Sequence, residues 1–213
     1  MKNKNQKIVW KSNYENTMEF VSVEIGKFIA VNGHITGESD GKLFHVSYKL
    51  RVDLCWDIEE VQIDFQSDTS FKKWFQKNKN HEWFNENDKL LPEFTGCTTI
   101  DISLSPFTNT LPINNLNLPE GLTKEIRVNY INLLALECKS VKQRYTNLSN
   151  HLYKFEDLTS GFTSSIEIDE EGYVIDYPGL WHRVFPGNNT QKSFLAKDIF
   201  CSALLSEINL LQS

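Results

Sequence analysis

The residues of this chain best suited to binding chemistry lie in one ten-residue segment, 104–113, which reads LSPFTNTLPI. Thr108, Asn109 and Thr110 offer two hydroxyl groups and an amide between two prolines. Each proline fixes its own φ at about −65° and disfavours helical backbone in the residue before it, so we expect a rigid loop with extended ends. The polar side chains could contact a ligand, or they could satisfy local turns and backbone groups.

A second polar segment, residues 168–184, reads IDEEGYVIDYPGLWHRV. Arg183 in this segment and Arg144 upstream could each hold a carboxylate or phosphate in a bidentate fork. Alternatively, the two arginines could form ion pairs with Asp101 and Asp176 that connect strands and have only a structural role. The candidate ligand-binding residues are Thr108, Asn109, Thr110, Arg144, Tyr145, Asp176, Tyr177, Trp181 and Arg183.

Sequence motifs for common catalytic and cofactor sites are absent. The chain contains no GxGxxG, GxxxxGK[ST], GxSxG or HExxH, and its five histidines lack ligand spacing, so we expect neither cofactor nor metal. Asp101 or Asp176 could act with His182 and Asn109 in hydrolysis, but sequence does not give the carboxylate separation that this chemistry requires. We therefore assign no catalytic residue.

Chain length, hydrophobic content and net charge indicate which classes of protein this chain can belong to. With 213 residues and 40% hydrophobic content the chain can bury a full core, and we expect one domain spanning residues 1–213. A net charge of −6 without basic clusters argues against nucleic acid as a partner. The opening MKNKNQK has no apolar run behind it and no segment approaches a membrane span, which predicts a cytoplasmic protein without a stable membrane anchor. Oligomeric state is left open.

Strand periodicity dominates the first half of the chain. From Phe44 to Ile58 every even position is apolar, and the odd positions are polar apart from Cys55. A period of two over fifteen residues indicates a long strand with one buried face. The alternation then changes parity, which predicts a turn or bulge near Glu59 and Glu60.

Shorter alternating runs at residues 99–104, 122–130 and 162–168, separated by turn signals, indicate an antiparallel sheet. Two further turn signals are Glu38-Ser39-Asp40-Gly41, before the long strand, and Tyr177-Pro178-Gly179-Leu180, which matches a type II turn. The predicted fold is mainly β: a curved sheet or half-open barrel of roughly a dozen antiparallel strands. Residues 191–211 have helical spacing and predict one C-terminal amphipathic helix, docked on the sheet or across the barrel opening.

Together, SPFTNTLPI and IDYPGLWHR closely resemble segments of the bacterial family of putative glycolipid-binding proteins. The short runs QRYT, residues 143–146, and YKFE, residues 153–156, resemble further signatures of that family. The resemblance extends over about residues 9–184 and is stronger after residue 96. It implies a fold similar to the half-open β-barrels of lipoprotein-localisation factors.

The leading hypothesis is a non-enzymatic binder of an amphipathic, lipid-like molecule, a glycolipid being one candidate, held on the concave face of the sheet. Aromatic residues make up 12% of the chain and can line such a cavity at little entropic cost. The alternative is a hydrolase acting on a sugar or ester-like substrate near the FTNTLP and DYPGLWHR segments. A third hypothesis is an interaction scaffold whose loops bind another protein.

Overall fold

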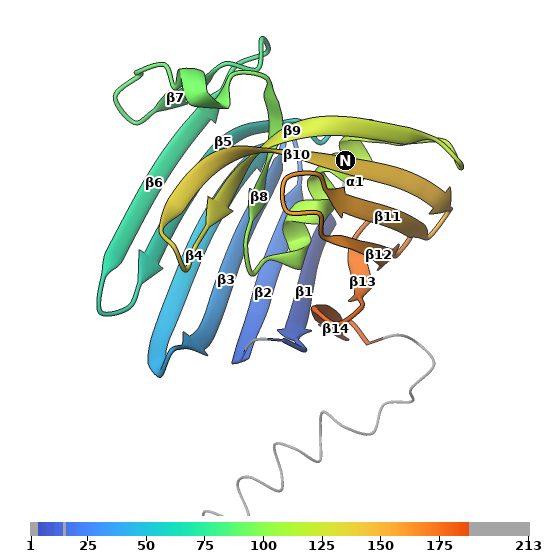
Figure 1. The fold of residues 1–213 in the computed structure, drawn as a ribbon, viewed down its shortest axis with the longest axis horizontal. Helices are drawn as coiled ribbons and strands as arrows, with labels where there is room; N and C mark the ends of the chain where they lie inside the picture. The colour runs from blue at the N-terminus through green and yellow to red at the C-terminus, as the bar shows by residue number, and fades with distance from the viewer. Residues whose placement is uncertain (1–3, 15, 188–213) are drawn as a thin grey trace, which may run out of the picture.

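The structure is a computed structural model that describes residues 4–14 and 16–187. The described chain forms one open sheet of fourteen strands, in the order β7-β6-β5-β4-β3-β2-β1-β14-β13-β12-β11-β10-β9-β8 (Figure 1). This confirms the prediction of a mainly β fold built on a curved sheet that is not closed into a barrel. The predicted helix at residues 191–211 lies outside the described residues. Among those described, no helix is both long and apolar enough to span a bilayer.

The first half of the sheet is a meander in which each strand pairs antiparallel with the next along the chain. Its strands are β1 (Lys4–Ser12), β2 (Asn16–Ile25), β3 (Ile29–Ser39), β4 (Lys42–Val52), β5 (Ile58–Gln66), β6 (Ser70–Lys77) and β7 (Trp83–Asn85).

The second half returns to the first, because its last strand pairs with β1. Its elements are the 3-10 turn η1 (Pro92–Phe94), β8 (Cys97–Ile102), the 3-10 turn η2 (Pro106–Asn109), the helix α1 (Thr110–Leu116), β9 (Thr123–Asn132), β10 (Glu137–Ser149), β11 (Leu152–Asp157), β12 (Thr163–Ile168), β13 (Val174–Tyr177) and β14 (Trp181–Phe185). The pairing of β8 with β9 is parallel, an exception to the predicted antiparallel pattern.

The alternation predicted for β4 is correct in register but too long. Even-numbered residues from Phe44 to Val52 are buried, and Lys49 and Arg51 are exposed. The predicted bulge near Glu59 and Glu60 is confirmed: Arg51 pairs with Glu60 and Val52 with Ile58, so the register skips Glu59, and the next buried residue after Ile58 is Val61. The strand β4 ends at Val52, however, and is followed by a turn at residues 53–57. The Asp53 carboxylate organises this turn by accepting the backbone N–H groups of residues 55 and 57 at 2.8 and 2.9 Å. The hydrogen bonds of the Asp53 side chain thus stabilise a turn after Val52, although the alternation of apolar residues continues to Ile58.

Two predicted turns are confirmed by their backbone geometry. Asp40 and Gly41 join β3 to β4 with φ values of 53° and 75°, which small or glycine residues adopt at low cost. At the β13–β14 connection Gly179 has φ 77°, and the Leu180 N–H donates to the Tyr177 carbonyl at 2.9 Å. This is the type II turn expected from the sequence.

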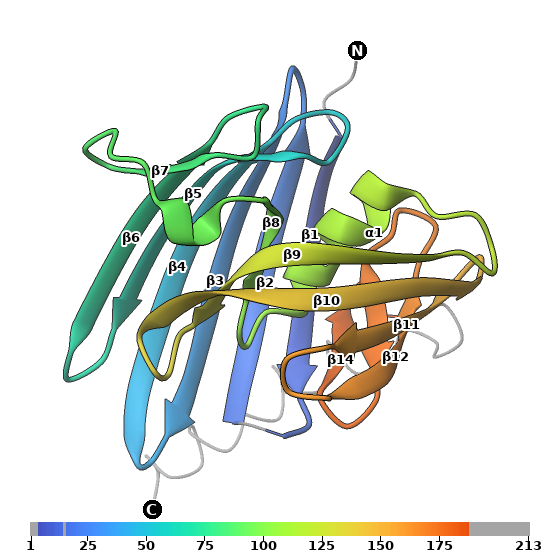
Figure 2. The same cartoon turned by 45° about the horizontal axis from the view of Figure 1, so that its top comes forward.

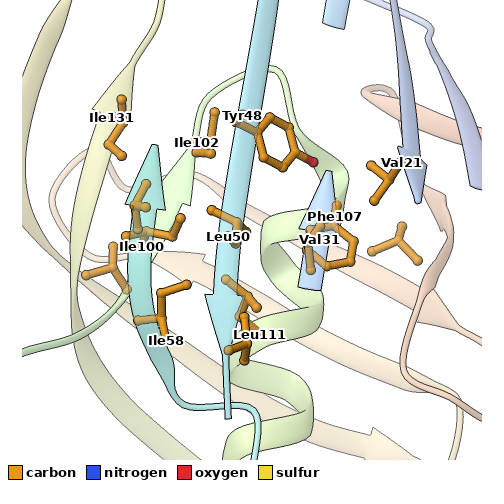
Figure 3. Close-up of a cluster of buried hydrophobic side chains, with 14 of the residues drawn as sticks. Val21, Val31, Tyr48, Leu50, Ile58, Ile100, Ile102, Phe107, Leu111 and Ile131 are labelled. Atoms are coloured by element: carbon orange, nitrogen blue, oxygen red, sulfur yellow. The ribbon is translucent and has the colours of Figure 1, made fainter. Parts of the chain in front are cut away.

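The sheet curves so that its two halves face each other. In both overall views β9 and β10 cross in front of β2 to β5, with η2 and α1 between them (Figures 1 and 2). Figure 3 shows Leu50 and Ile58 from the first half, Ile100 and Ile131 from the second, and Phe107 from η2 meeting in one apolar cluster. The inserted η2–α1 segment therefore packs within the core between the two halves.

The segment at residues 104–113 is consequently not the extended, projecting loop that its two prolines suggested. Ser105 is extended, as expected, but Leu111 is helical although it precedes Pro112. Pro112 lies in the first turn of α1, where a missing N–H costs little. Phe107 and Leu111 have no solvent exposure, so burial of this apolar segment between the halves outweighs the local preference for an extended chain.

Candidate functional site

A cavity of about 600 Å³ lies between the η2 region and the second half of the sheet. Such a volume falls within the usual range of small-molecule sites. Its lining residues are Ser12, Tyr14, Asp101, Ile102, Ser103, Leu104, Ser105, Pro106, Asn109, Tyr130, Asn132, Lys139, Val141, Gln143, Phe155, Asp157, Thr159, Ser160, Phe162, Tyr177, Leu180 and Trp181.

Aromatic side chains form one part of the wall. The rings of Phe155, Phe162 and Tyr177 contact one another with centroids 6.2 to 6.4 Å apart, and Trp181 lies in the same lining. Phe155, Tyr177 and Trp181 are buried, whereas Phe162 is 40% exposed. Rigid rings of this kind offer a large apolar surface with few rotatable bonds to immobilise. This part of the wall suits an alkyl chain or the apolar face of a sugar.

A hydrogen-bonded network around the Asp101 carboxylate forms a polar part of the wall. The Gln143 amide donates to Asp101 Oδ2 at 2.6 Å, and the Thr108 hydroxyl lies 3.2 Å from Asp101 Oδ1. Burial raises the pKa of Asp101, because the charged form loses solvation, and the negative charge of Asp157 raises it further. The hydrogen bonds from Gln143 and Thr108 act in the opposite direction. Asp101 is therefore held in a fixed position by neutral donors.

Asn109, at the end of η2, continues this wall. Its Oδ1 accepts the Tyr145 hydroxyl at 3.0 Å, and its Nδ2 donates to the Pro106 carbonyl at 3.4 Å. Asn109 lines the cavity although only 7% of it is exposed, while Tyr145 lies behind it with 1% exposure. The rotamer of Asn109 is thus fixed by buried partners, as a specific recognition site requires.

Two further charged residues lie on the lining. Asp157 closes the turn after β11 by accepting the N–H groups of Thr159 and Ser160, at 2.7 and 3.2 Å, and the Ser160 hydroxyl at 2.7 Å. Lys139 is exposed, with its ammonium 5.8 Å from the centre of the Tyr130 ring. Asp157 therefore has a structural role as well as a place in the cavity.

The structure brings some of the predicted binding residues together. Asn109, Tyr177 and Trp181 line the cavity, and Thr108 and Tyr145 contact lining residues from behind. Thr110 is fully buried at the start of α1, outside the lining, and its hydroxyl has no hydrogen-bond partner.

The predicted charged residues lie elsewhere. Arg144 pairs with Glu125 and Glu156, and Arg183 pairs with Asp169. Neither arginine lines the cavity, nor does Asp176, which lies opposite His182 in the β13–β14 register. The alternative pairing of the arginines with Asp101 and Asp176 is wrong, because Arg144 pairs with acids on the two neighbouring strands and Arg183 pairs with Asp169 in the turn after β12.

The residues proposed for hydrolysis do not meet in this cavity. Asp101 and Asn109 line it, but His182 contacts Asn13, with 2.7 Å between Nδ1 and Oδ1, and is absent from the lining. The arrangement therefore provides no histidine beside Asp101 to act as its acid–base partner.

Sequence reasoning missed Tyr130, Gln143, Phe155, Asp157 and Phe162 as lining residues. A signal for Gln143 was present in the QRYT run. Successive residues of a strand point to opposite faces, so Arg144 could not share a face with Gln143 and Tyr145. The period of two would have favoured Gln143 over Arg144.

The fold and the cavity define a class of protein: an open, curved β-sheet around a partly aromatic, partly polar cavity. Within that class, the chain belongs to the family described as "Putative glycolipid-binding", whose model matches residues 7–183. Among solved structures, the chain is similar to a protein of the DUF1089 family from Pseudomonas aeruginosa, with 34% identity, a TM-score of 0.73, and coverage of 78% of this chain and 92% of that chain.

A β-barrel-like protein of the domain of unknown function DUF1849, from Brucella abortus, is 7% identical, with a TM-score of 0.47 and coverage of 85% of this chain and 94% of that chain. No curated protein matches this chain significantly.

Proposed function

We propose that this protein binds an amphipathic, lipid-like molecule, with a glycolipid as one member of that class, in the cavity between η2 and the second half of the sheet. The single observation that carries the proposal is the division of one cavity into an aromatic wall and a hydrogen-bonding wall. The alkyl part of the ligand lies against Phe155, Phe162 and Trp181. Its polar head contacts Asp101 and Asn109.

Membership of a family described as glycolipid-binding supports the same proposal independently of the cavity. The internal support of the polar wall adds to it. Gln143 and Tyr145 hold Asp101 and Asn109 at their cavity positions through hydrogen bonds of 2.6 and 3.0 Å. Preorganised polar groups lose little entropy on binding, which favours recognition of a defined head group.

The test is titration with octyl β-glucoside, a neutral amphiphile, below its micelle concentration, followed by intrinsic tryptophan fluorescence, to which Trp181 in the lining contributes, and by displacement of Nile red. We expect saturable binding. Phe162→Ser should weaken it by about tenfold, because a partly exposed ring on the cavity wall is lost. Native mass spectrometry of the purified protein should show a co-purified small molecule.

Phe20→Ser is the matched control. Phe20 is 37% exposed, close to the 40% of Phe162, but lies on β2 outside the cavity lining. Its substitution should leave the affinity unchanged. Equal losses in both variants, or no saturable binding by the unmodified protein, would contradict the proposal.

A further inference from the structure

The charged residues that line the cavity limit which head group of an amphipathic ligand the cavity can bind. Asp101 and Asp157 both line the cavity, and within residues 4–14 and 16–187 neither carboxylate forms an ion pair. Among the described residues that line the cavity, Lys139 is the only basic one, and it is exposed. The arginines suited to phosphate or carboxylate, Arg144 and Arg183, already pair with acids elsewhere. An anionic head group would therefore meet negative charge and no bidentate donor.

The two carboxylates act on both walls of the cavity. Burial raises the pKa of Tyr130 and of Tyr177, and the negative charges of Asp101 and Asp157 raise both further. Tyr130 lies on β9 beside Lys139, and Tyr177 belongs to the aromatic wall on β13. The sheet register agrees with this proximity, because Asp101 on β8 lies opposite Tyr130 on β9.

Asp101 in particular retains capacity for a cationic partner. Each of its oxygens faces one neutral donor, Gln143 or Thr108, and a carboxylate oxygen can accept more than one hydrogen bond. Charges removed from water are usually paired, and this pair is incomplete within the described chain. An ammonium group offers three donors and is also attracted to aromatic faces, which this cavity supplies.

We propose that the polar head of the ligand carries a protonated amine, which pairs with Asp101 and is flanked by the aromatic rings of Tyr130 and Tyr177. The inference rests on the proposed function, since it names the head-group chemistry of the same cavity. An amino sugar or another amine carried on an alkyl chain belongs to this class. Head groups with a carboxylate or phosphate do not.

The experiment compares three amphiphiles that share an octyl chain and a sugar ring: octyl β-glucosaminide, octyl β-glucoside and octyl β-glucuronide. Affinities are measured by titration calorimetry in low salt at neutral pH, because acid would protonate Asp101, whose pKa is raised by burial. We expect the glucosaminide to bind about tenfold more tightly than the glucoside, and the glucuronide to bind most weakly. Added salt should weaken the glucosaminide alone.

Asp101→Asn tests the assigned partner. This variant keeps the shape of the side chain and one acceptor oxygen but replaces the other oxygen with an amide donor and removes the charge. It should abolish the preference for the glucosaminide, so that the glucosaminide and the glucoside bind with similar affinity. Asp64→Asn is the control, because Asp64 lies on β5 outside this cavity and pairs with Lys72. Its affinities should match those of the unmodified protein.

The outcomes separate this inference from the proposed function. Equal affinity for the glucosaminide and the glucoside, or tightest binding of the glucuronide, would overturn the amine inference while the cavity remained a binding site. Absence of saturable binding by all three amphiphiles would overturn both. If Asp101→Asn fails to fold, the ranking of the three probes and their salt dependence in the unmodified protein decide the question.

Discussion

The two sides of the η2 segment each contain a buried carboxyl group, but in contrasting settings. On the side of the first half-sheet, Glu19 is fully buried, its Oε1 accepts the Tyr48 hydroxyl at 2.7 Å, and its Oε2 accepts the Phe107 N–H at 3.4 Å. On the other side, Asp101 is only partly buried and lies on the wall of the cavity.

The difference shows how the same chemical group serves structure in one place and recognition in another. Complete burial raises the pKa of Glu19 to about 7, and its two hydrogen bonds link β2 and β4 to η2. Asp101 keeps access to a cavity and can therefore respond to a ligand. We expect changes near Glu19 to alter stability and changes near Asp101 to alter binding.

The largest expected effect is that of Gly33→Ala on the Glu19 side. Gly33 lies opposite Tyr48 in the β3–β4 register, and an added Cβ would lie 1.9 Å from Cζ of the Tyr48 ring. The ring must move and release Glu19, so we expect a loss of about 4 kcal/mol in the free energy of unfolding, measured by urea denaturation. Gly187→Ala is the control, because no heavy atom lies within 4 Å of its added Cβ. Similar stability of the two variants would contradict this packing.

The second effect is the pH dependence of stability that Glu19 contributes. Its pKa rises from 4.5 to about 7 on folding, so the folded state binds this proton more tightly than the unfolded state. This contribution is complete below pH 4.5 and is lost as the pH rises through about 7. The loss is on the order of 3 kcal/mol.

Urea denaturation across this pH range, on the unmodified protein and on Glu19→Gln, measures the effect. The variant cannot ionise, so its stability should lack this component and exceed that of the unmodified protein above neutral pH. Parallel pH profiles for the two proteins would show that Glu19 titrates normally and that its environment is wetter than the structure indicates.

A third comparison separates Asn109 from Arg183, both of which the sequence assigned to ligand binding. Asn109→Ala should weaken binding of octyl β-glucoside, because Asn109 lines the cavity. Arg183→Ala should instead cost about 2 kcal/mol of stability and leave the affinity unchanged, because the largely buried Arg183 pairs with Asp169 away from the cavity. Thermal unfolding and amphiphile titration of both variants provide the measurement. Loss of affinity in Arg183→Ala would restore its role as a ligand residue.

The smallest effect is expected for Arg144→Ala. Its guanidinium pairs with Glu125 and Glu156, and its side chain and that of Glu125 are 34% and 53% exposed. Solvent screens such pairs, so neither the melting temperature nor the affinity for octyl β-glucoside should change measurably. A clear loss of affinity would show that the ligand reaches the face of the sheet that carries Arg144.

Local sequence determined one long strand and two turns of the sheet. The alternation from Phe44 to Val52, the Asp40-Gly41 hairpin and the type II turn before Leu180 depend on strand periodicity and on backbone preferences at one or two residues. These features depend only on residues that are close together in the sequence, so they could be predicted without the tertiary structure. The resemblance of SPFTNTLPI and IDYPGLWHR to one family likewise identified the family without any contact being known.

The candidate site was only partly predictable, because its residues come from separate strands. Asn109, Tyr177 and Trp181 were assigned to it from the sequence and do line the cavity. Phe155 and Phe162 were not assigned, since nothing local indicates which apolar residues of a β-rich chain face a cavity and which face the core.

The tertiary structure alone decided the positions of the charged residues and the conformation of residues 104–113. The sheet register brings Glu125 and Glu156 beside Arg144, and the fold brings Asp169, in the turn after β12, to Arg183; no sequence spacing reveals those partners. The two prolines favoured extended ends, but burial of Phe107 and Leu111 between two curved half-sheets made the segment helical. Local preferences amount to about 1 kcal/mol per residue, whereas burying one large apolar side chain contributes about 2 to 3 kcal/mol, so long-range packing determined the outcome.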